Sequence, residues 1–195
     1  MLNMGFKEEL EAILETTPKT RNTYLFSATM PNPLLSIANR YMKNPVEVTI
    51  GRKNSGAENV EHLSYLVHAR DKYLALKRIV DFHPNVYGIV FCTTKAETQE
   101  LSDHLVRDGY SADCLHGDLA QAQRDKVMHR FRHKAIKALL ATDVAARGID
   151  VKNITHIIHY HLPDDIENYT HRSGRTARAG QKGISIALLH IREAY

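Results

Sequence analysis

The chain has 195 residues, of which 43% are hydrophobic and 25% are charged, with a net charge of +4 at pH 7. These proportions are ordinary for a globular protein with a hydrophobic core, and the mild positive charge is compatible with a polyanionic partner. The only cysteines, Cys92 and Cys114, cannot form a disulfide framework or a zinc site by themselves, and no apolar run approaches a membrane span. We therefore expect a cytoplasmic protein that has no membrane partner.

The first 50 residues predict four elements. They are a helix over 7–16 that ends before Pro18, a strand over 23–26, a helix over 31–42 and a strand over 46–50. This is too little to bury a core of its own, so we expect residues 1–50 to be the C-terminal part of a larger domain. Residues 51–59 are polar and rich in turn formers, which predicts a linker, and residues 60–195 form the second domain.

From residue 60 onward, predicted strands and helices alternate. The strands are expected at 62–67, 87–92, 112–115, 138–141, 154–160 and 184–189, and the helices at 72–82, 96–108, 121–133 and 165–173. Such alternation predicts an α/β fold with a mostly parallel sheet and helices on both faces. Ligands of these folds bind at the carboxyl ends of the strands, and this is where the motifs below are found.

Residues 171–180 carry three arginines, Arg172, Arg175 and Arg178, at a spacing of three. On a helix this spacing places neighbours on one face, and guanidinium groups bind oxyanions through paired N–H donors. The pattern favours a phosphate clamp. The alternative is a basic helix end that interacts with its own C-terminal dipole.

Residues 141–150 contain a second candidate site. Thr142 ends a predicted strand, where its hydroxyl can donate to a phosphate. Asp150 follows Gly148, and its carboxylate can accept hydrogen bonds from the two hydroxyls of a ribose. The alternative for Asp150 is an ordinary turn residue. We expect Asp143 and Arg147 to support the loop by pairing within the domain.

Four further residues are candidates for contact with a nucleic-acid backbone. Thr93 lies where a strand ends and a helix begins, a place where amides and hydroxyls can hold a phosphate. Gly117 follows the next strand, and Gln121 and Arg124 start the helix after it. The alternatives are an ordinary helix cap at Thr93 and surface polar residues at Gln121 and Arg124.

The stretch H-R-x-G-R-T-x-R at residues 171–178 resembles the last motif of the DEAD-box RNA helicases. Residues 141–150 resemble the fifth motif of that family, and residues 91–95 the fourth. Ser27-Ala28-Thr29 resembles the family motif that couples nucleotide hydrolysis to strand separation. The sequence departs from the family at Ala177, where Gly is most frequent, and at His161, where Asp is frequent.

The resemblance implies a RecA-like helicase C-terminal domain in residues 60–195, preceded by the tail of the N-terminal ATP-binding domain. Arg175 and Arg178 would be arginine fingers, and they would bind ATP together with Gly148 and Asp150. Ser27 and Thr29 would take part in catalysis. RNA would be bound mainly through its single-stranded backbone, at positions already described as backbone contacts (Thr93, Gly117, Gln121, Arg124 and Thr142).

The phosphate-loop motif G-x-x-x-x-G-K-[ST] does not occur in these 195 residues. The resemblance therefore implies that Mg²⁺ and the ATP phosphates are held by the missing N-terminal domain, and that this chain alone is inactive. Two alternatives are a non-catalytic RNA clamp or scaffold and a DNA-directed helicase of the same superfamily. No metal site is expected at His156, His159 and His161, because no Cys, Asp or Glu joins them at ligand spacing.

Overall fold

The computed structural model describes residues 7–27, 30, 32–49 and 59–190. The chain divides into two compact units, Met1–Ser55 and Gly56–Tyr195. The second unit contains all of the strands found among the described residues.

The first unit contains α1 (Lys7–Thr16) and α2 (Asn32–Tyr41), close to where helices are predicted. The two helices are joined by an ion pair of 3.1 Å between Arg40 and Glu11. The strand prediction for 23–26 is wrong, and the prediction for 46–50 is wrong over its described part, 46–49. A parallel strand needs a hydrogen-bonding neighbour, and the described residues of this unit supply none. Phe26 is consequently 91% exposed and Val48 81% exposed.

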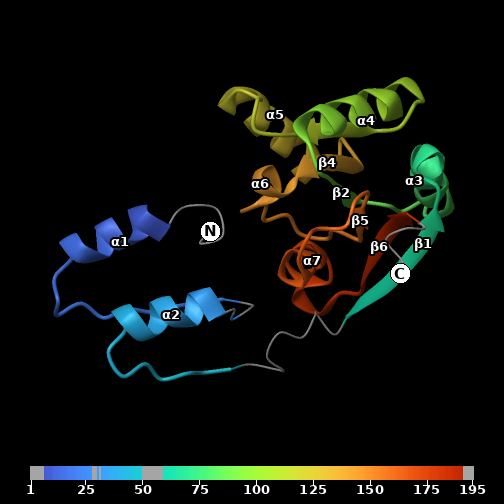
Figure 1. Ribbon diagram of the computed structural model, residues 1–195. Coiled ribbons are helices and arrows are strands. Elements are labelled where there is room, and N and C mark those ends of the chain that lie inside the picture. The colour runs from blue at the N-terminus through green and yellow to red at the C-terminus, as the bar shows by residue number, and fades with distance from the viewer. Residues whose placement is uncertain (1–6, 28–29, 31, 50–58, 191–195) are drawn as a thin grey trace. The chain divides into compact units, whose positions relative to one another are not determined.

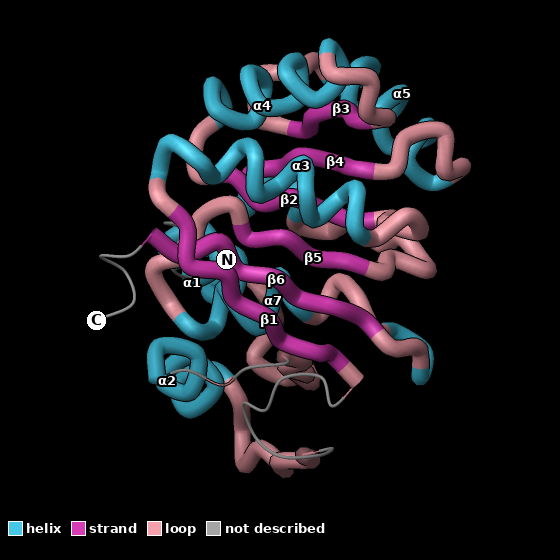
Figure 2. The backbone as a smooth tube through the Cα atoms, turned by 90° about the vertical axis from the view of Figure 1, so that its right-hand side faces the viewer, coloured by secondary structure: helices cyan, strands magenta, loops and turns pink. Residues whose placement is uncertain are grey.

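The second unit is built on one six-stranded sheet, in which all neighbouring strands are parallel. The strand order is β1-β6-β5-β2-β4-β3, and Figure 2 shows these strands side by side. Their bounds are β1 (Val60–Val67), β2 (Gly88–Cys92), β3 (Ala112–Leu115), β4 (Ala138–Thr142), β5 (His156–His159) and β6 (Gly183–His190). The central strands β2 and β4 are buried along their whole length, as expected for strands covered on both faces.

Helices cover both faces of the sheet. They are α3 (Lys72–Phe82), α4 (Lys95–Arg107), α5 (Gln121–Arg132), α6 (Asp143–Ala146) and α7 (Ile166–Ser173), with short 3₁₀ turns η2 (Ala69–Asp71) and η3 (Arg178–Gly180). Leu76 of α3 and Leu105 of α4 belong to the core on one face, and Phe131 of α5 and Ala145 of α6 belong to the core on the other. Figure 1 shows α7 on the opposite side of β6 from α3.

The predicted α/β fold with a parallel sheet and helices on both faces is confirmed. Each predicted strand and helix after residue 60 is present, with ends that differ by at most two residues. The sequence pattern does not predict α6, whose four residues are too few to show a helical period. Among the described residues, none of the helices combines the length and the apolar character that a membrane span requires.

Candidate functional site

The carboxyl ends of three adjacent strands bring together several of the predicted contact residues. In the parallel register Cys92 of β2 pairs with Thr142 of β4, and Leu115 of β3 pairs with Ala141 of β4. Thr93 follows Cys92 directly, and Gly117 follows β3 by two residues. Thr93, Gly117 and Thr142 therefore lie at one edge of the sheet.

The turn after β2 is ordered by the start of α4. The Thr94 hydroxyl accepts a hydrogen bond from the Glu97 amide at 3.1 Å, which caps the helix. In return the Glu97 carboxylate accepts a hydrogen bond from the Thr93 amide at 3.1 Å. Lys95 forms an ion pair of 2.6 Å with Asp118, so that this turn also contacts the turn after β3. Thr93 itself is exposed at the surface.

The turn after β3 is loosely packed at Gly117, which is exposed. A Cβ added there would meet only the side chain of Lys95, with Cε at 3.3 Å. Packing within the domain thus does not demand glycine at this position, whereas the close approach of a phosphate backbone would.

The first turn of α5 carries two predicted RNA contacts, Arg124 and Gln121, which have different hydrogen-bond partners. The Arg124 guanidinium donates to the carbonyl of His116 at 3.3 Å, which places it beside the turn that contains Gly117. Gln121 is exposed, and its amide donates to Asp125 at 2.8 Å. Thr142 is the N-cap residue of α6 and is only 8% exposed.

A second group gathers around the loop after α6. Gly148 has φ of +73°, a conformation that favours glycine and that turns the chain before Asp150. Arg178 forms an ion pair of 2.7 Å with Asp150, and the Arg175 guanidinium donates to the carbonyl of Ile149 at 3.0 Å. Burial lowers the pKa of Arg175, and the nearby charge of Arg178 lowers it further, while Asp150 opposes both. An arginine remains charged despite such a shift.

Arg172 is not part of this group, and the prediction of three arginines on one helical face is wrong. The helix α7 ends at Ser173, so Arg175 and Arg178 lie beyond it. Arg172 is 4% exposed and binds Asp143 through two hydrogen bonds of 2.6 Å each. The expected pairing of Asp143 within the domain is therefore present. Arg147 is exposed.

The predicted residues of the first unit are placed only in part. Ser27 is described and exposed, and Thr29 lies outside the described residues.

One cluster that the motifs do not single out lies at the same edge of the sheet. His161, just after β5, contacts Glu97 through Nε2 at 2.7 Å and Lys72 through Nδ1 at 3.3 Å. The departure from the family pattern at His161 is the sequence signal that points to it. Within the described residues, no group of three His, Cys, Asp or Glu side chains could hold a metal ion.

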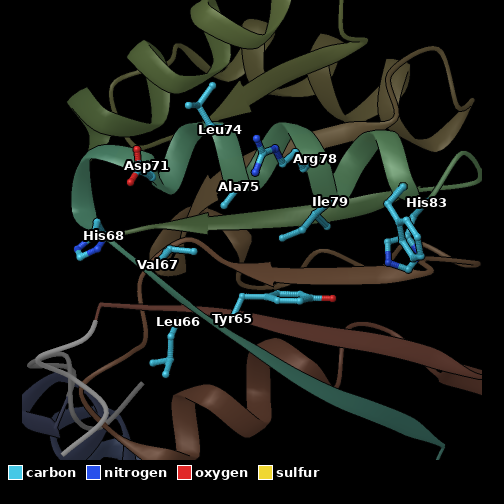
Figure 3. A pocket seen from close by; sticks show the side chains of 11 residues that line it. Tyr65, Leu66, Val67, His68, Asp71, Leu74, Ala75, Arg78, Ile79 and His83 are labelled. Carbon is cyan, nitrogen blue, oxygen red and sulfur yellow. The ribbon is translucent and has the colours of Figure 1, made fainter.

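A groove of about 600 Å³ lies between β1 and α3. Its lining is mainly apolar, and Figure 3 shows Tyr65, Leu66, Leu74 and Ile79 around it. None of the predicted site residues lines this groove.

Comparison with known proteins identifies the family. The model of the helicase conserved C-terminal domain matches residues 71–180, which is more than half of the chain. The DEAD-box ATP-dependent RNA helicase CshA of Bacillus cereus is 44% identical over 194 residues, which cover 100% of this chain and 37% of that protein. The chain belongs to the DEAD-box helicase family. CshA of Geobacillus kaustophilus is also 44% identical, over 99% of this chain and 41% of its own length.

Solved structures of DEAD-box proteins share the fold. A DEAD box protein from Methanococcus jannaschii is 43% identical, with a TM-score of 0.68, and the match covers 100% of this chain and 52% of that one. Dbp5 of S. cerevisiae, bound to RNA and ADP BeF3, is 28% identical with a TM-score of 0.87, over 96% of this chain and 50% of its own. This DEAD-box chain spans less than half the length of the curated CshA proteins that it matches.

Proposed function

We propose that this chain supplies the second half of an ATP-dependent RNA helicase. It would bind the backbone of single-stranded RNA along the carboxyl edge of the sheet and present arginines to ATP held by an N-terminal ATP-binding domain. The observation that carries the proposal is the gathering of Thr93, Gly117 and Thr142 at adjacent strand ends. Family membership supports it, because relatives of this chain are named ATP-dependent RNA helicases.

The RNA-binding part of the proposal rests on groups that recognise phosphates. An exposed threonine, a bare glycine turn and the first turn of α5 offer hydroxyl, amide and guanidinium donors side by side. Backbone donors and positive charge fix the register of a strand without reading its bases. We therefore expect RNA binding with slight sequence preference, in which contacts to 2′-hydroxyls distinguish RNA from DNA.

The residues around Asp150 fit an adenine nucleotide. The Asp150 side chain is 82% exposed and can accept hydrogen bonds from vicinal ribose hydroxyls. Arg178 is 39% exposed, and Arg175 precedes it by three residues. Both guanidinium groups can therefore donate to phosphate oxygens of one nucleotide. Arg178 donates to the Oδ1 atom of Asp150 at 2.7 Å, so the second carboxylate oxygen, Oδ2, can accept from the ribose while this bond is kept.

ATP supplies the phosphoryl group that is transferred to water. The role of Arg175 and Arg178 is to stabilise the negative charge that develops on this group. Gly148 sets the turn that presents Asp150 to the ribose. We assign Mg²⁺ to the N-terminal domain, together with the phosphate loop that this sequence lacks. Ser27 and Thr29 are proposed to couple hydrolysis to strand separation.

The decisive experiment replaces Arg175. The aligned segment of Geobacillus kaustophilus CshA is exchanged for this chain, which is 44% identical to it, and Arg175→Ala is introduced into the chimera. We expect RNA-stimulated ATP turnover to fall by about 10³- to 10⁵-fold, because an arginine finger acts on charge present only in the transition state. Nucleotide affinity is expected to fall much less.

Two further variants control this test. Arg175→Lys should restore little turnover, because an ammonium group lacks the planar fork. Arg107→Ala removes an exposed arginine from the C-terminal end of α4, far in sequence from Arg175, and should leave turnover unchanged. Near-normal turnover of Arg175→Ala, combined with a lower melting temperature, would mean that Arg175 only supports the loop through its bond to Ile149.

A further inference from the structure

His161 is linked by hydrogen bonds to α3, α4 and α7, and through α7 to α6. Its ring lies between Lys72 at the start of α3 and Glu97 in the first turn of α4. Its backbone carbonyl accepts a hydrogen bond of 2.7 Å from Arg172 of α7, the arginine that binds Asp143 of α6. Lys72 is 4% exposed, and the His161 side chain is 33% exposed.

The partners of His161 determine where its proton resides. The Lys72 ammonium group carries only donors, so the His161 nitrogen that faces it at 3.3 Å, Nδ1, has to be the acceptor. A neutral imidazole that accepts at Nδ1 carries its hydrogen on Nε2. Nε2–H then donates to the Glu97 carboxylate at 2.7 Å. This is a directed chain of hydrogen bonds from Lys72 through His161 to Glu97.

The hydrogen-bond chain continues to Thr93, a residue that is proposed to bind RNA. Glu97 uses its Oε1 atom for His161 and its Oε2 atom for the Thr93 amide, at 2.7 and 3.1 Å. Both carboxylate oxygens are therefore engaged, and the carboxylate cannot turn without losing one of these bonds. A rigid carboxylate fixes the exposed turn of Thr93 relative to β5 and the sheet.

We propose that His161 is a positioning residue that acts through Glu97 to hold the Thr93 turn in the geometry that binds an RNA phosphate. This inference rests on the proposed function, because the role of Thr93 belongs to it. The family often has Asp at this position, and an Asp here would face the Glu97 carboxylate with a like charge. The histidine instead joins Lys72 to Glu97, and so extends the support of the turn to the buried start of α3.

The first experiment needs neither RNA nor ATP. The ¹⁵N spectrum of the His161 ring in the 195-residue chain should show one protonated and one unprotonated nitrogen at neutral pH, with the proton on Nε2. The Thr93 amide should shift in His161→Asn, whose side chain can accept from Lys72 but is too short to reach Glu97. His161→Gln, which is long enough to donate to Glu97, should keep the Thr93 resonance near its original position.

The second experiment measures RNA affinity of the same three chains by titration with a single-stranded oligouridine. Loss of one supporting hydrogen bond corresponds to about a 2- to 10-fold change, so His161→Asn should bind that much more weakly and His161→Gln within about 2-fold of the unchanged protein. Melting temperatures are measured in parallel. If His161→Asn is poorly folded, Glu97→Gln provides the same test, because a carboxamide can accept from only one of the two donors.

The outcomes separate the two proposals. A proton on Nδ1, an unmoved Thr93 amide in His161→Asn, or equal RNA affinity of the Asn variant and the unchanged chain would overturn the positioning role. Equal weakening by Asn and Gln would overturn it too, because only packing of the ring would then matter. If the unchanged chain binds no RNA, the proposed function fails, while the spectra still decide whether the hydrogen-bond chain exists.

Discussion

At the scale of single residues, burial decides what each arginine of the 171–180 stretch can do. Arg172 is 4% exposed and has its charge matched by Asp143, so it holds α7 against the start of α6. Removing Asp143, whose side chain is 34% exposed, would leave the buried Arg172 charge without this partner and so destabilise the fold. Arg178 is 39% exposed, and its partner Asp150 lies in solvent, where an ion pair contributes little stability. Arg178 and Asp150 can therefore exchange each other for a ligand, whereas the buried Arg172 cannot.

Ala177 carries backbone strain that glycine would relieve. Its φ of 55° lies in the left-handed region, which glycine adopts without the steric conflict of a Cβ. We expect Ala177→Gly to raise the free energy of unfolding by about 1 kcal/mol, because the relief of strain exceeds the added entropy of the unfolded chain. Urea denaturation of the unchanged chain and of Ala177→Gly measures this difference in the free energy of unfolding. Lower stability of the glycine variant would show that the loop is not strained at this residue.

These residues also show the limit of reading the sequence alone. The spacing of Arg172, Arg175 and Arg178 is correct for one helical face, but the helix α7 ends at Ser173, before the second and third arginines. A helix end depends on how the chain packs onto the sheet, which a three-residue spacing does not encode. The hydrogen-bond chain from Lys72 through His161 to Glu97 joins residues that are 89 and 64 positions apart, so no local motif contains it. The family pattern marks only its centre, His161.

At the scale of elements, the strands after residue 60 are predictable because each is a short apolar run between turns, and each finds a neighbour in the sheet. The same pattern fails at 23–26 and 46–49, where the described residues offer no neighbouring strand. A strand is thus a property of the sheet that it joins, whereas α1, stabilised by its own hydrogen bonds, is predicted with its observed bounds.

The strand β5 makes the domain sensitive to acid. Burial lowers the pKa of His156 to about 4, with a contribution from His83, and burial together with Arg172 and His62 lowers that of His159 to about 3. Both rings are neutral in the folded state, while an unfolded histidine takes up a proton below about pH 6.5. Stability is therefore unaffected above this pH, and is lost as the pH falls from about 6.5 toward 4 and 3.

The expected loss at pH 5 is about 2 kcal/mol for each ring, since each pH unit below 6.5 contributes about 1.4 kcal/mol. Urea unfolding at pH 7 and at pH 5 measures this loss of stability. His156→Asn can keep the hydrogen bond to Thr155 but does not titrate, so it should lose less stability between these two pH values. An identical loss in both proteins would assign the acid sensitivity to other groups.

At the scale of the whole chain, the six parallel strands place their carboxyl ends at one edge, and the proposed RNA contacts follow from this arrangement. The edge holds donors for phosphates and belongs to only one of the two domains that a complete helicase would use. RNA binding by this chain should therefore be weak, tolerant of sequence and steeply dependent on salt, because most of its free energy would come from released counterions.

Arg124 provides the quantitative test. If it neutralises one RNA phosphate, Arg124→Ala should reduce the slope of log affinity against log salt concentration by about 0.7, the value for one contact on a single strand. Arg132, an exposed arginine at the other end of α5, lies about 12 Å away along the helix axis, which exceeds the screening length at physiological salt. Arg132→Ala should consequently leave the slope unchanged. The affinities are measured for two unrelated single strands at several salt concentrations. Equal slopes for both variants would remove Arg124 from the RNA site, and a large affinity difference between the two strands would show that bases are read.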